Sequence, residues 1–163
     1  LPKDHINLFP LKNALGQFNQ RGGPPVFMFE ERAEGYKIVR TIGDDDYDDK
    51  LLIKAANYDL AITRSGASTI SELGYLNIPF VAIPFPYAKD NHQYYNAEFY
   101  EKNKSCWLIM QKDIDENNFT DLMIKIFQDQ NEYFSKKNNL IKLNKENTWE
   151  KNKSKLIELI NEN

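Results

Sequence analysis

The fold is decided by the stretch Asp59–Glu72, DLAITRSGASTISE. Its first five residues form a short apolar run of the kind that predicts a buried strand. Small polar residues follow at once, and Thr69–Leu76 then has the apolar spacing of a helix. A buried strand that passes through small residues into a helix is typical of an α/β protein with a parallel sheet.

Strands and helices alternate along the rest of the chain. Further strands are predicted over 36–42, 78–83 and 105–110, and helices over 50–57, 90–103 and most of 114–160. The alternation predicts a Rossmann-like parallel sheet with helices on both faces. A sheet of this kind binds its ligands outside the carboxyl ends of the strands.

The first 35 residues show no clear periodicity. Gly22-Gly23-Pro24-Pro25 is a strong turn signal, and Val26–Phe29 is long enough for a short strand. We therefore divide the chain into a segment over 1–35 and an α/β domain over 36–163. The start at Leu1 has neither an initiator methionine nor a signal peptide, so we expect a fragment or a processed chain.

Composition narrows the class of protein. A chain of 163 residues is long enough for one compact domain, and a net charge of −3 gives no reason to expect a nucleic-acid partner. No apolar run approaches the roughly 20 residues that span a bilayer. The one cysteine, Cys106, cannot form an internal disulfide, and we predict that it is buried and unreactive beside a core Trp107.

The residues between the strand and the helix have the properties of a site for an anionic ligand. Residues 66–68 leave no bulk over the helix start, where backbone N–H groups and the positive end of the helix dipole are exposed. Ser65 and Thr69 add hydroxyl donors, so a diphosphate is a suitable ligand without a metal. The alternative is structural, because Thr69-Ile70-Ser71-Glu72 has the pattern of a capping box with Thr69 as N-cap and Glu72 at N3.

A second polar stretch follows the next buried strand. Lys89–Asn96, KDNHQYYN, is predicted to begin a helix with Asp90 as its N-cap. His92, Gln93 and Asn96 are spaced three and four residues apart, so they share one helix face. Their neutral donors and acceptors suit sugar hydroxyls and an acetamide. A solvated helix face is the alternative, but two polar helix starts at one sheet edge favour a site.

These two stretches together resemble the MurG family of bacterial N-acetylglucosaminyltransferases. The matching motifs are Arg64-Ser65-Gly66-Ala67-Ser68-Thr69 with Ser71-Glu72, then Ile78-Pro79, Pro84, and Lys89-Asp90-Asn91-His92-Gln93 with Asn96-Ala97. The similarity covers about residues 36–112. It implies the C-terminal, donor-binding half of a two-domain GT-B glycosyltransferase, in which two Rossmann-like domains face each other across a cleft.

The resemblance also implies roles for individual residues. The implied substrate-binding set is Ile42, Arg64, Ser65, Gly66, Ala67, Ser68, Thr69, Glu72, His92, Gln93 and Asn96. Within it, residues 65–69 are expected at the diphosphate, Glu72 at the ribose hydroxyls and Ile42 against the uracil. His92, Gln93 and Asn96 are expected at the sugar. No catalytic residue is expected in this chain, because the general base would lie in the missing acceptor domain.

The implied reaction is a metal-independent, inverting transfer of N-acetylglucosamine from UDP-N-acetylglucosamine. The acceptor would be a lipid-linked muramyl-pentapeptide of peptidoglycan synthesis, bound by a missing N-terminal domain or by a partner chain. No cofactor, metal or nucleic acid is expected. The implied location is cytoplasmic, peripheral on the inner face of the cell membrane.

Some features depart from the family pattern and leave alternatives open. A Gly-Gly-Ser-Gln-Gly type loop, expected at the start of the domain, is not found in residues 1–35. The acidic run Asp44–Asp49 is also longer than the resemblance implies, and spaced aspartates of this kind bind Mn²⁺ or Mg²⁺ in another glycosyltransferase fold. A solvated charge run is the alternative to a metal site. A UDP-N-acetylglucosamine epimerase and a non-catalytic donor-binding module are the alternatives to a transferase.

Overall fold

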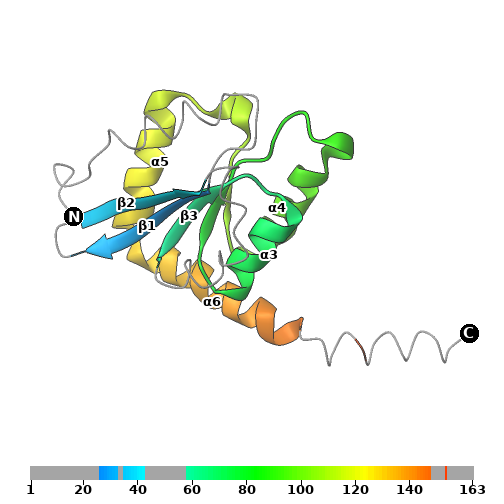
Figure 1. Ribbon diagram of the computed structural model, residues 1–163. Coiled ribbons are helices and arrows are strands. Elements are labelled where there is room, and N and C mark those ends of the chain that lie inside the picture. Colours follow the sequence, from blue (N-terminus) through cyan, green and yellow to red (C-terminus); the bar gives the residue numbers. More distant parts are fainter. Residues whose placement is uncertain (1–25, 33–34, 43–57, 148–152, 154–163) are drawn as a thin grey trace, which may run out of the picture.

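The computed structural model describes residues 26–32, 35–42, 58–147 and 153. These residues include a five-stranded sheet with the strand order β2-β1-β3-β4-β5 (Figure 1). The strands are β1 (Val26–Arg32), β2 (Gly35–Ile42), β3 (Leu60–Thr63), β4 (Phe80–Ala82) and β5 (Trp107–Leu108). The sheet carries the two polar turns described above at the ends of β3 and β4.

Helices follow the strands of the parallel part. They are α3 (Ala67–Tyr75), α4 (His92–Lys102), α5 (Glu116–Gln128) and α6 (Gln130–Glu146), with short 3₁₀ turns η2 (Lys89–Asn91) and η3 (Gln111–Asp113). The helix predicted over 50–57 and the end of the last helical region lie outside the described residues. Among the residues that the structure describes, no helix is both long and apolar enough to cross a membrane.

The parallel part of the sheet confirms the predicted α/β fold. β3 pairs with β4 and β4 with β5, both in parallel, and Thr63 lies beside Ala82. Every residue of β3 and β4 is buried, because helices cover both faces of these strands. The strands are shorter than their apolar runs predicted, since β5 keeps only two residues of the run over 105–110.

The strands at the other side of the sheet were predicted, but their pairing was not. β1 runs antiparallel to both β2 and β3, so the complete sheet is mixed. The reason is the connection between β1 and β2, which spans only residues 33–34. A parallel crossover needs about a dozen residues, whereas two residues suffice for an antiparallel hairpin. β1 lies before residue 35, but both of its partner strands, β2 and β3, follow it in the chain. Our division of the chain at residue 35 stays a prediction.

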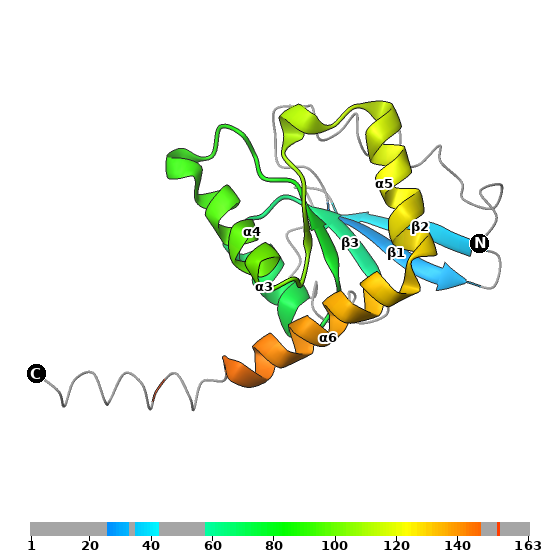
Figure 2. The same ribbon diagram turned by 180° about the vertical axis from the view of Figure 1, so that it is seen from behind.

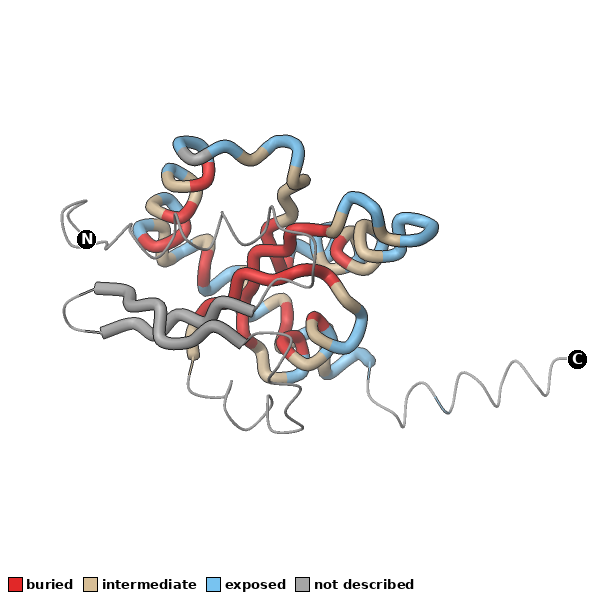
Figure 3. The backbone as a smooth tube through the Cα atoms, turned by 45° about the horizontal axis from the view of Figure 1, so that its top comes forward, coloured by how far each residue is buried: buried red, intermediate tan, exposed pale blue. Residues whose placement is uncertain are grey.

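The sheet separates two hydrophobic cores. On one face, the side chains of Leu60, Ile62, Val81 and Ile83 pack against α5 and the start of α6, where Phe119, Met123, Ile126, Phe127 and Tyr133 are buried. On the other face, Ala61, Phe80 and Ala82 pack against Ile70, Leu73, Ala97 and Leu140 of α3, α4 and α6. Figure 2 shows α3 and α4 on the opposite side of the strands from α5, and Figure 3 shows the buried residues gathered between these layers.

The apolar side chains of α5, which recur three and four residues apart, therefore belong to the core. Cys106, just before β5, and Trp107, its first residue, are also buried, as predicted. Cys106 is 1% exposed, and the indole Nε1 of Trp107 donates a hydrogen bond to the carboxylate of Glu132 at 2.9 Å. Burial raises the pKa of Cys106 to about 12, so its thiol is protonated at neutral pH.

Candidate functional site

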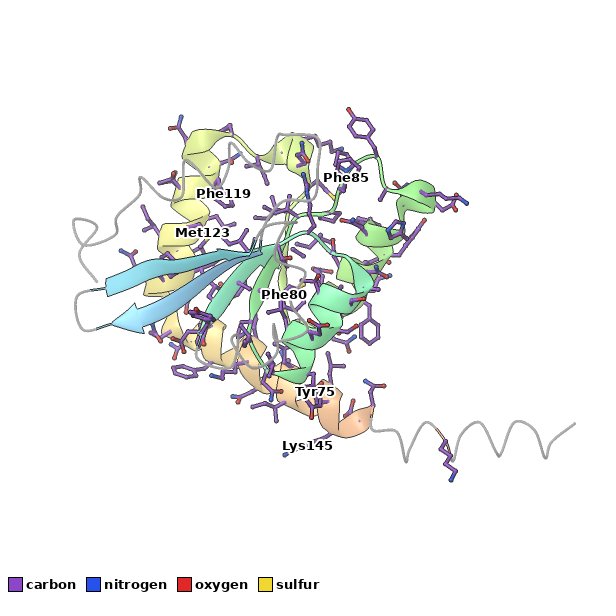
Figure 4. All side chains as sticks on the ribbon, viewed as in Figure 1. Tyr75, Phe80, Phe85, Phe119, Met123 and Lys145 are labelled. Atoms are coloured by element: carbon purple, nitrogen blue, oxygen red, sulfur yellow. The ribbon has the colours of Figure 1, made fainter. Side chains whose placement is uncertain are left out.

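Two turns meet at one edge of the sheet. β3 ends at Thr63 and β4 at Ala82, and these two residues are neighbours in the parallel ladder. The turns that lead into α3 and α4 therefore leave the sheet side by side. This confirms the prediction that the two polar helix starts lie at one edge of the sheet. Figure 4 shows Phe85, in the second of these turns, at the opposite end of the molecule from Tyr75 and Lys145.

The start of α3 has no side-chain cap. Gly66 is the N-cap residue, and within the described part of the chain the first turn has no side-chain cap hydrogen bond. The first intrahelical bond is from the N–H of Ile70 to the carbonyl of Gly66, at 3.1 Å. The N–H groups of Ala67, Ser68 and Thr69 therefore precede the helical hydrogen-bond ladder and are available to an anion. No atom of the described residues lies within 4 Å of the position that a Cβ on Gly66 would take, so among them this side of the turn is open.

The predicted capping box is wrong. The helix begins at Ala67, two residues before Thr69, which places Thr69 at N3 and Glu72 at N6. Ala67 and Ser68 are accommodated in the helix because Gly66, with φ −61° and ψ 137°, supplies the extended residue that precedes it. The structural explanation of these polar residues as cap ligands therefore fails, which strengthens the interpretation as an anion site.

Ser65 contributes a buried hydroxyl just before this helix start. The residue is 0% exposed, and its Oγ has no hydrogen-bond partner among the described residues. Buried polar atoms are almost always paired, so an unpaired one calls for a specific explanation. A ligand that is not present in the structure is one such explanation.

Arg64 lies at the end of β3 and is 7% exposed. Its Nη1 donates hydrogen bonds to the carbonyl oxygens of Ile83 and Pro84, both at 3.1 Å. The guanidinium carbon also lies 5.4 Å from the centroid of the Phe85 ring, a cation–π contact. Burial lowers the pKa of Arg64 to about 10, so the side chain is still charged at neutral pH. In this structure the guanidinium binds the end of β4.

The start of α4 differs from the prediction. Asp90 does not cap the helix; it lies in the 3₁₀ turn η2 with φ 53°, and Asn91, also at φ 53°, is the N-cap residue. Two successive left-handed residues reorient the chain before the helix begins, and sequence spacing does not show such a turn. His92 follows and is exposed, with its Nδ1 2.7 Å from the carbonyl of Lys89. A carbonyl only accepts, so Nδ1 carries the proton and Nε2 of the neutral ring is an acceptor.

The two amides on α4 connect it to the neighbouring turns. Gln93 Oε1 accepts a hydrogen bond from the backbone N–H of Phe85 at 3.0 Å. Asn96 Nδ2 donates to the carbonyl of Ser65 at 3.1 Å, across 31 residues of sequence. Both amides were predicted at the site, but neither backbone partner was. Local spacing carries no signal for contacts between segments this far apart in the chain.

Two predicted residues remain, Glu72 and Ile42. Glu72 is half-buried on α3. Ile42 is the last residue of β2 and pairs with Val26, while Phe27 pairs with Ile62 of β3. This register places the backbone of Ile42 at the edge where β3 ends. The acidic run over 44–49 lies outside the described residues, and no metal-binding cluster of three His, Cys, Asp or Glu side chains occurs within them.

A hollow of about 550 Å³ lies elsewhere, where α5 meets α6. It is lined by Asp121, Ile124, Lys125, Gln128, Asp129, Gln130 and Asn131, none of which belongs to the two turns. We locate the functional site at the sheet edge, because the uncapped helix start and the buried hydroxyl of Ser65 are there.

Comparison with known proteins identifies the family of this domain. The glycosyltransferase family 28 C-terminal domain matches residues 17–155, a range that contains both turns. A protein of Pelagibacter ubique (strain HTCC1062) is 50% identical over 105 residues, which is 64% of this chain and 30% of that protein. A protein of Rickettsia conorii (strain ATCC VR-613 / Malish 7) is 37% identical over 110 residues, 68% of this chain and 29% of that protein.

Both relatives are named UDP-N-acetylglucosamine--N-acetylmuramyl-(pentapeptide) pyrophosphoryl-undecaprenol N-acetylglucosamine transferase. Among solved structures, Acinetobacter baumannii MurG matches with a TM-score of 0.49 and 25% identity, over 53% of this chain and 25% of that one. The chain thus spans less than a third of the length of the curated relatives that it matches. The resemblance to MurG is confirmed, and the chain belongs to the glycosyltransferase family 28 C-terminal domain family.

Proposed function

We propose that this chain binds UDP-N-acetylglucosamine and supplies the donor half of a hexosyltransferase. The acceptor in this proposal is a lipid-linked muramyl-pentapeptide of peptidoglycan synthesis, held by a second domain or a partner chain. The observation that carries the proposal is the start of α3. It is a helix N-terminus with no side-chain cap, set at the carboxyl end of a parallel strand in a glycosyltransferase family 28 domain.

The diphosphate is assigned to this helix start. The free N–H groups of residues 67–69 and the positive end of the α3 dipole suit two phosphate charges without a metal ion. The Ser65 hydroxyl would donate one more hydrogen bond. Since that hydroxyl is covered in the structure, the donor has to gain access to it on binding. The hydroxyls of Ser68 and Thr69 lie in the first turn and are further donors.

The rest of the donor is assigned along the same edge. Glu72 would accept hydrogen bonds from the ribose hydroxyls, and Ile42 would lie against the uracil. On α4, the sugar would meet Gln93 and the acceptor nitrogen Nε2 of His92, which is exposed. These assignments come from the family resemblance. The strand register, which brings the backbone of Ile42 to the edge where β3 ends, supports the assignment of Ile42.

The chemistry follows from the donor's leaving group. In an inverting transfer the acceptor hydroxyl attacks the anomeric carbon in line, the bond from that carbon to the phosphate oxygen breaks, and UDP leaves. Negative charge grows on the diphosphate as this bond breaks. The N-terminus of α3 would stabilise that charge, since its N–H dipoles are already oriented before the reaction. The general base would come from the acceptor domain, which we place at the inner face of the cytoplasmic membrane.

Titration calorimetry on the full chain tests the proposal. We expect UDP and UDP-N-acetylglucosamine to bind, GDP to bind more weakly, and EDTA to leave each affinity unchanged. Absence of UDP binding at millimolar ligand would contradict the proposal, and loss of binding in EDTA would return the metal to consideration. A new product formed from UDP-N-acetylglucosamine alone would instead indicate an epimerase.

A further inference from the structure

Contacts between the two turns form a closed ring. Arg64 donates to the carbonyls at the end of β4 and packs on the ring of Phe85. The backbone N–H of Phe85 donates to Gln93 on α4. One helical turn further, Asn96 donates to the carbonyl of Ser65, which is bonded in the chain to Arg64. The ring therefore joins the β3–α3 turn, the segment after β4 and α4 into one unit.

The hydrogen bond from Asn96 to Ser65 closes this ring at the anion site. The Ser65 carbonyl belongs to the same planar peptide group as the N–H of Gly66, and a trans peptide points the two in opposite directions. A bond that fixes the carbonyl toward α4 therefore fixes the N–H of Gly66 away from α4. The orientation of this peptide in turn sets the direction in which the first turn of α3 leaves it.

We propose that Asn96 is a positioning residue, whose side-chain amide holds the β3–α3 turn in the geometry that binds the diphosphate. The inference rests on the proposed function and changes the role given to Asn96 by resemblance, from sugar contact to support of the phosphate subsite. The two roles differ in what they predict. A sugar contact affects only UDP-N-acetylglucosamine, whereas a support of the phosphate turn affects UDP as well.

The test compares Asn96→Ala with Asn103→Ala in the full chain. Asn103 is a matched control, because its Nδ2 donates only to Phe99 within the same helix, at 2.8 Å. Asn96→Ala is expected to weaken UDP and UDP-N-acetylglucosamine by the same factor, about fivefold for one neutral hydrogen bond. Asn103→Ala is expected to change neither affinity. Weaker binding of UDP-N-acetylglucosamine alone, or no change in either ligand, would overturn the proposal.

Hydrogen exchange without ligand gives a second measurement that does not depend on the donor. The N–H of Ile70 bonds to Gly66 at the start of α3, and the N–H of Phe85 bonds to Gln93. If the ring is one unit, Asn96→Ala speeds exchange at both, by about fivefold. The N–H of Leu76, at the far end of α3, should not change. Unchanged exchange at Ile70 would overturn the proposal even if UDP binds.

The two proposals therefore fail in distinguishable ways. A wild-type chain that binds no UDP contradicts the proposed function, while the exchange rates still decide whether Asn96 positions the turn. Asn96→Leu keeps a side chain of similar size and removes the donor without adding a charge. It is expected to give the same pattern, and it replaces the alanine variant if that variant does not fold.

Discussion

Replacing Ser65 by alanine should stabilise the protein and weaken its ligand binding at the same time. The Ser65 hydroxyl is fully buried and has no partner within the described residues. Leaving a buried hydroxyl unpaired costs about 1–3 kcal/mol, so its removal should raise the free energy of unfolding by about that amount. In a chain of 163 residues, each kcal/mol corresponds to a rise of roughly 2–4 °C in Tm.

Binding should change in the opposite direction. A hydrogen bond to a charged group contributes about 1.5–3 kcal/mol. If the hydroxyl donates to the diphosphate, Ser65→Ala therefore weakens UDP binding by about tenfold or more. Thermal unfolding followed by circular dichroism gives the first quantity, and calorimetric titration with UDP gives the second.

Ser105→Ala is the matched control for this substitution. Ser105 is also 0% exposed, but its Oγ donates a hydrogen bond to the carbonyl of Tyr100 at 2.8 Å. The same change there should lower the free energy of unfolding by about 1 kcal/mol and leave UDP binding intact. The reasoning is refuted if Ser65→Ala lowers Tm as Ser105→Ala does. It is also refuted if Ser65→Ala leaves the affinity for UDP unchanged.

Further predictions concern two residues of the site, Glu72 and Gly66, and the buried Cys106. Glu72→Gln should weaken UDP binding by about tenfold. Its Tm should not change, since Glu72 lies outside the helix cap. An unchanged affinity for UDP would contradict the assignment of Glu72 to the ribose hydroxyls. Gly66→Ala should be tolerated by the fold, because its φ and ψ suit any residue and the space is open, while the added methyl group should weaken UDP binding measured by calorimetry. Cys106 should react with iodoacetamide at pH 8 about a thousand times more slowly than a free cysteine, because burial raises its pKa to about 12. The pKa of the Cys106 thiol is about 9 in the unfolded chain and about 12 in the folded chain. The contribution of this thiol to the free energy of unfolding therefore falls as the pH rises between these two values.

Local patterns in the sequence were sufficient for the parallel core. The apolar runs at β3 and β4 are buried on both faces, so they contain few polar residues and are recognised without knowledge of their neighbours. The buried side chains of α5 are recognised in the same way, because their spacing of three and four residues places them on one helix face. The mixed pairing of β1 was missed, although the two-residue connection between β1 and β2 requires it once both strands are placed.

The sequence predicted that two polar turns lie at one sheet edge, which is confirmed, but it did not predict the geometry of their helix starts. The pattern Thr69-Ile70-Ser71-Glu72 indicated a later helix start, but Gly66 allows the helix to begin at Ala67. The two left-handed residues before α4 depend on how this segment packs after β4, and no residue spacing encodes that. The contact between Asn96 and Ser65 is likewise tertiary. The sequence therefore predicted that the two turns lie at one edge, and the structure shows the hydrogen bonds that connect them to α4.

The last described helix has a consequence for how the domain is assembled. α6 buries Tyr133 in one core and Leu140 in the other, so it passes from one face of the sheet to the other within two turns. It is also bound at both ends of this crossing, through Tyr133 to the carbonyl of Asp59 and through Asn144 to the carbonyl of Gly74. Each of the two cores therefore depends on a side chain from α6. A substitution that loosens α6 would therefore expose apolar surface on both faces of the sheet at once.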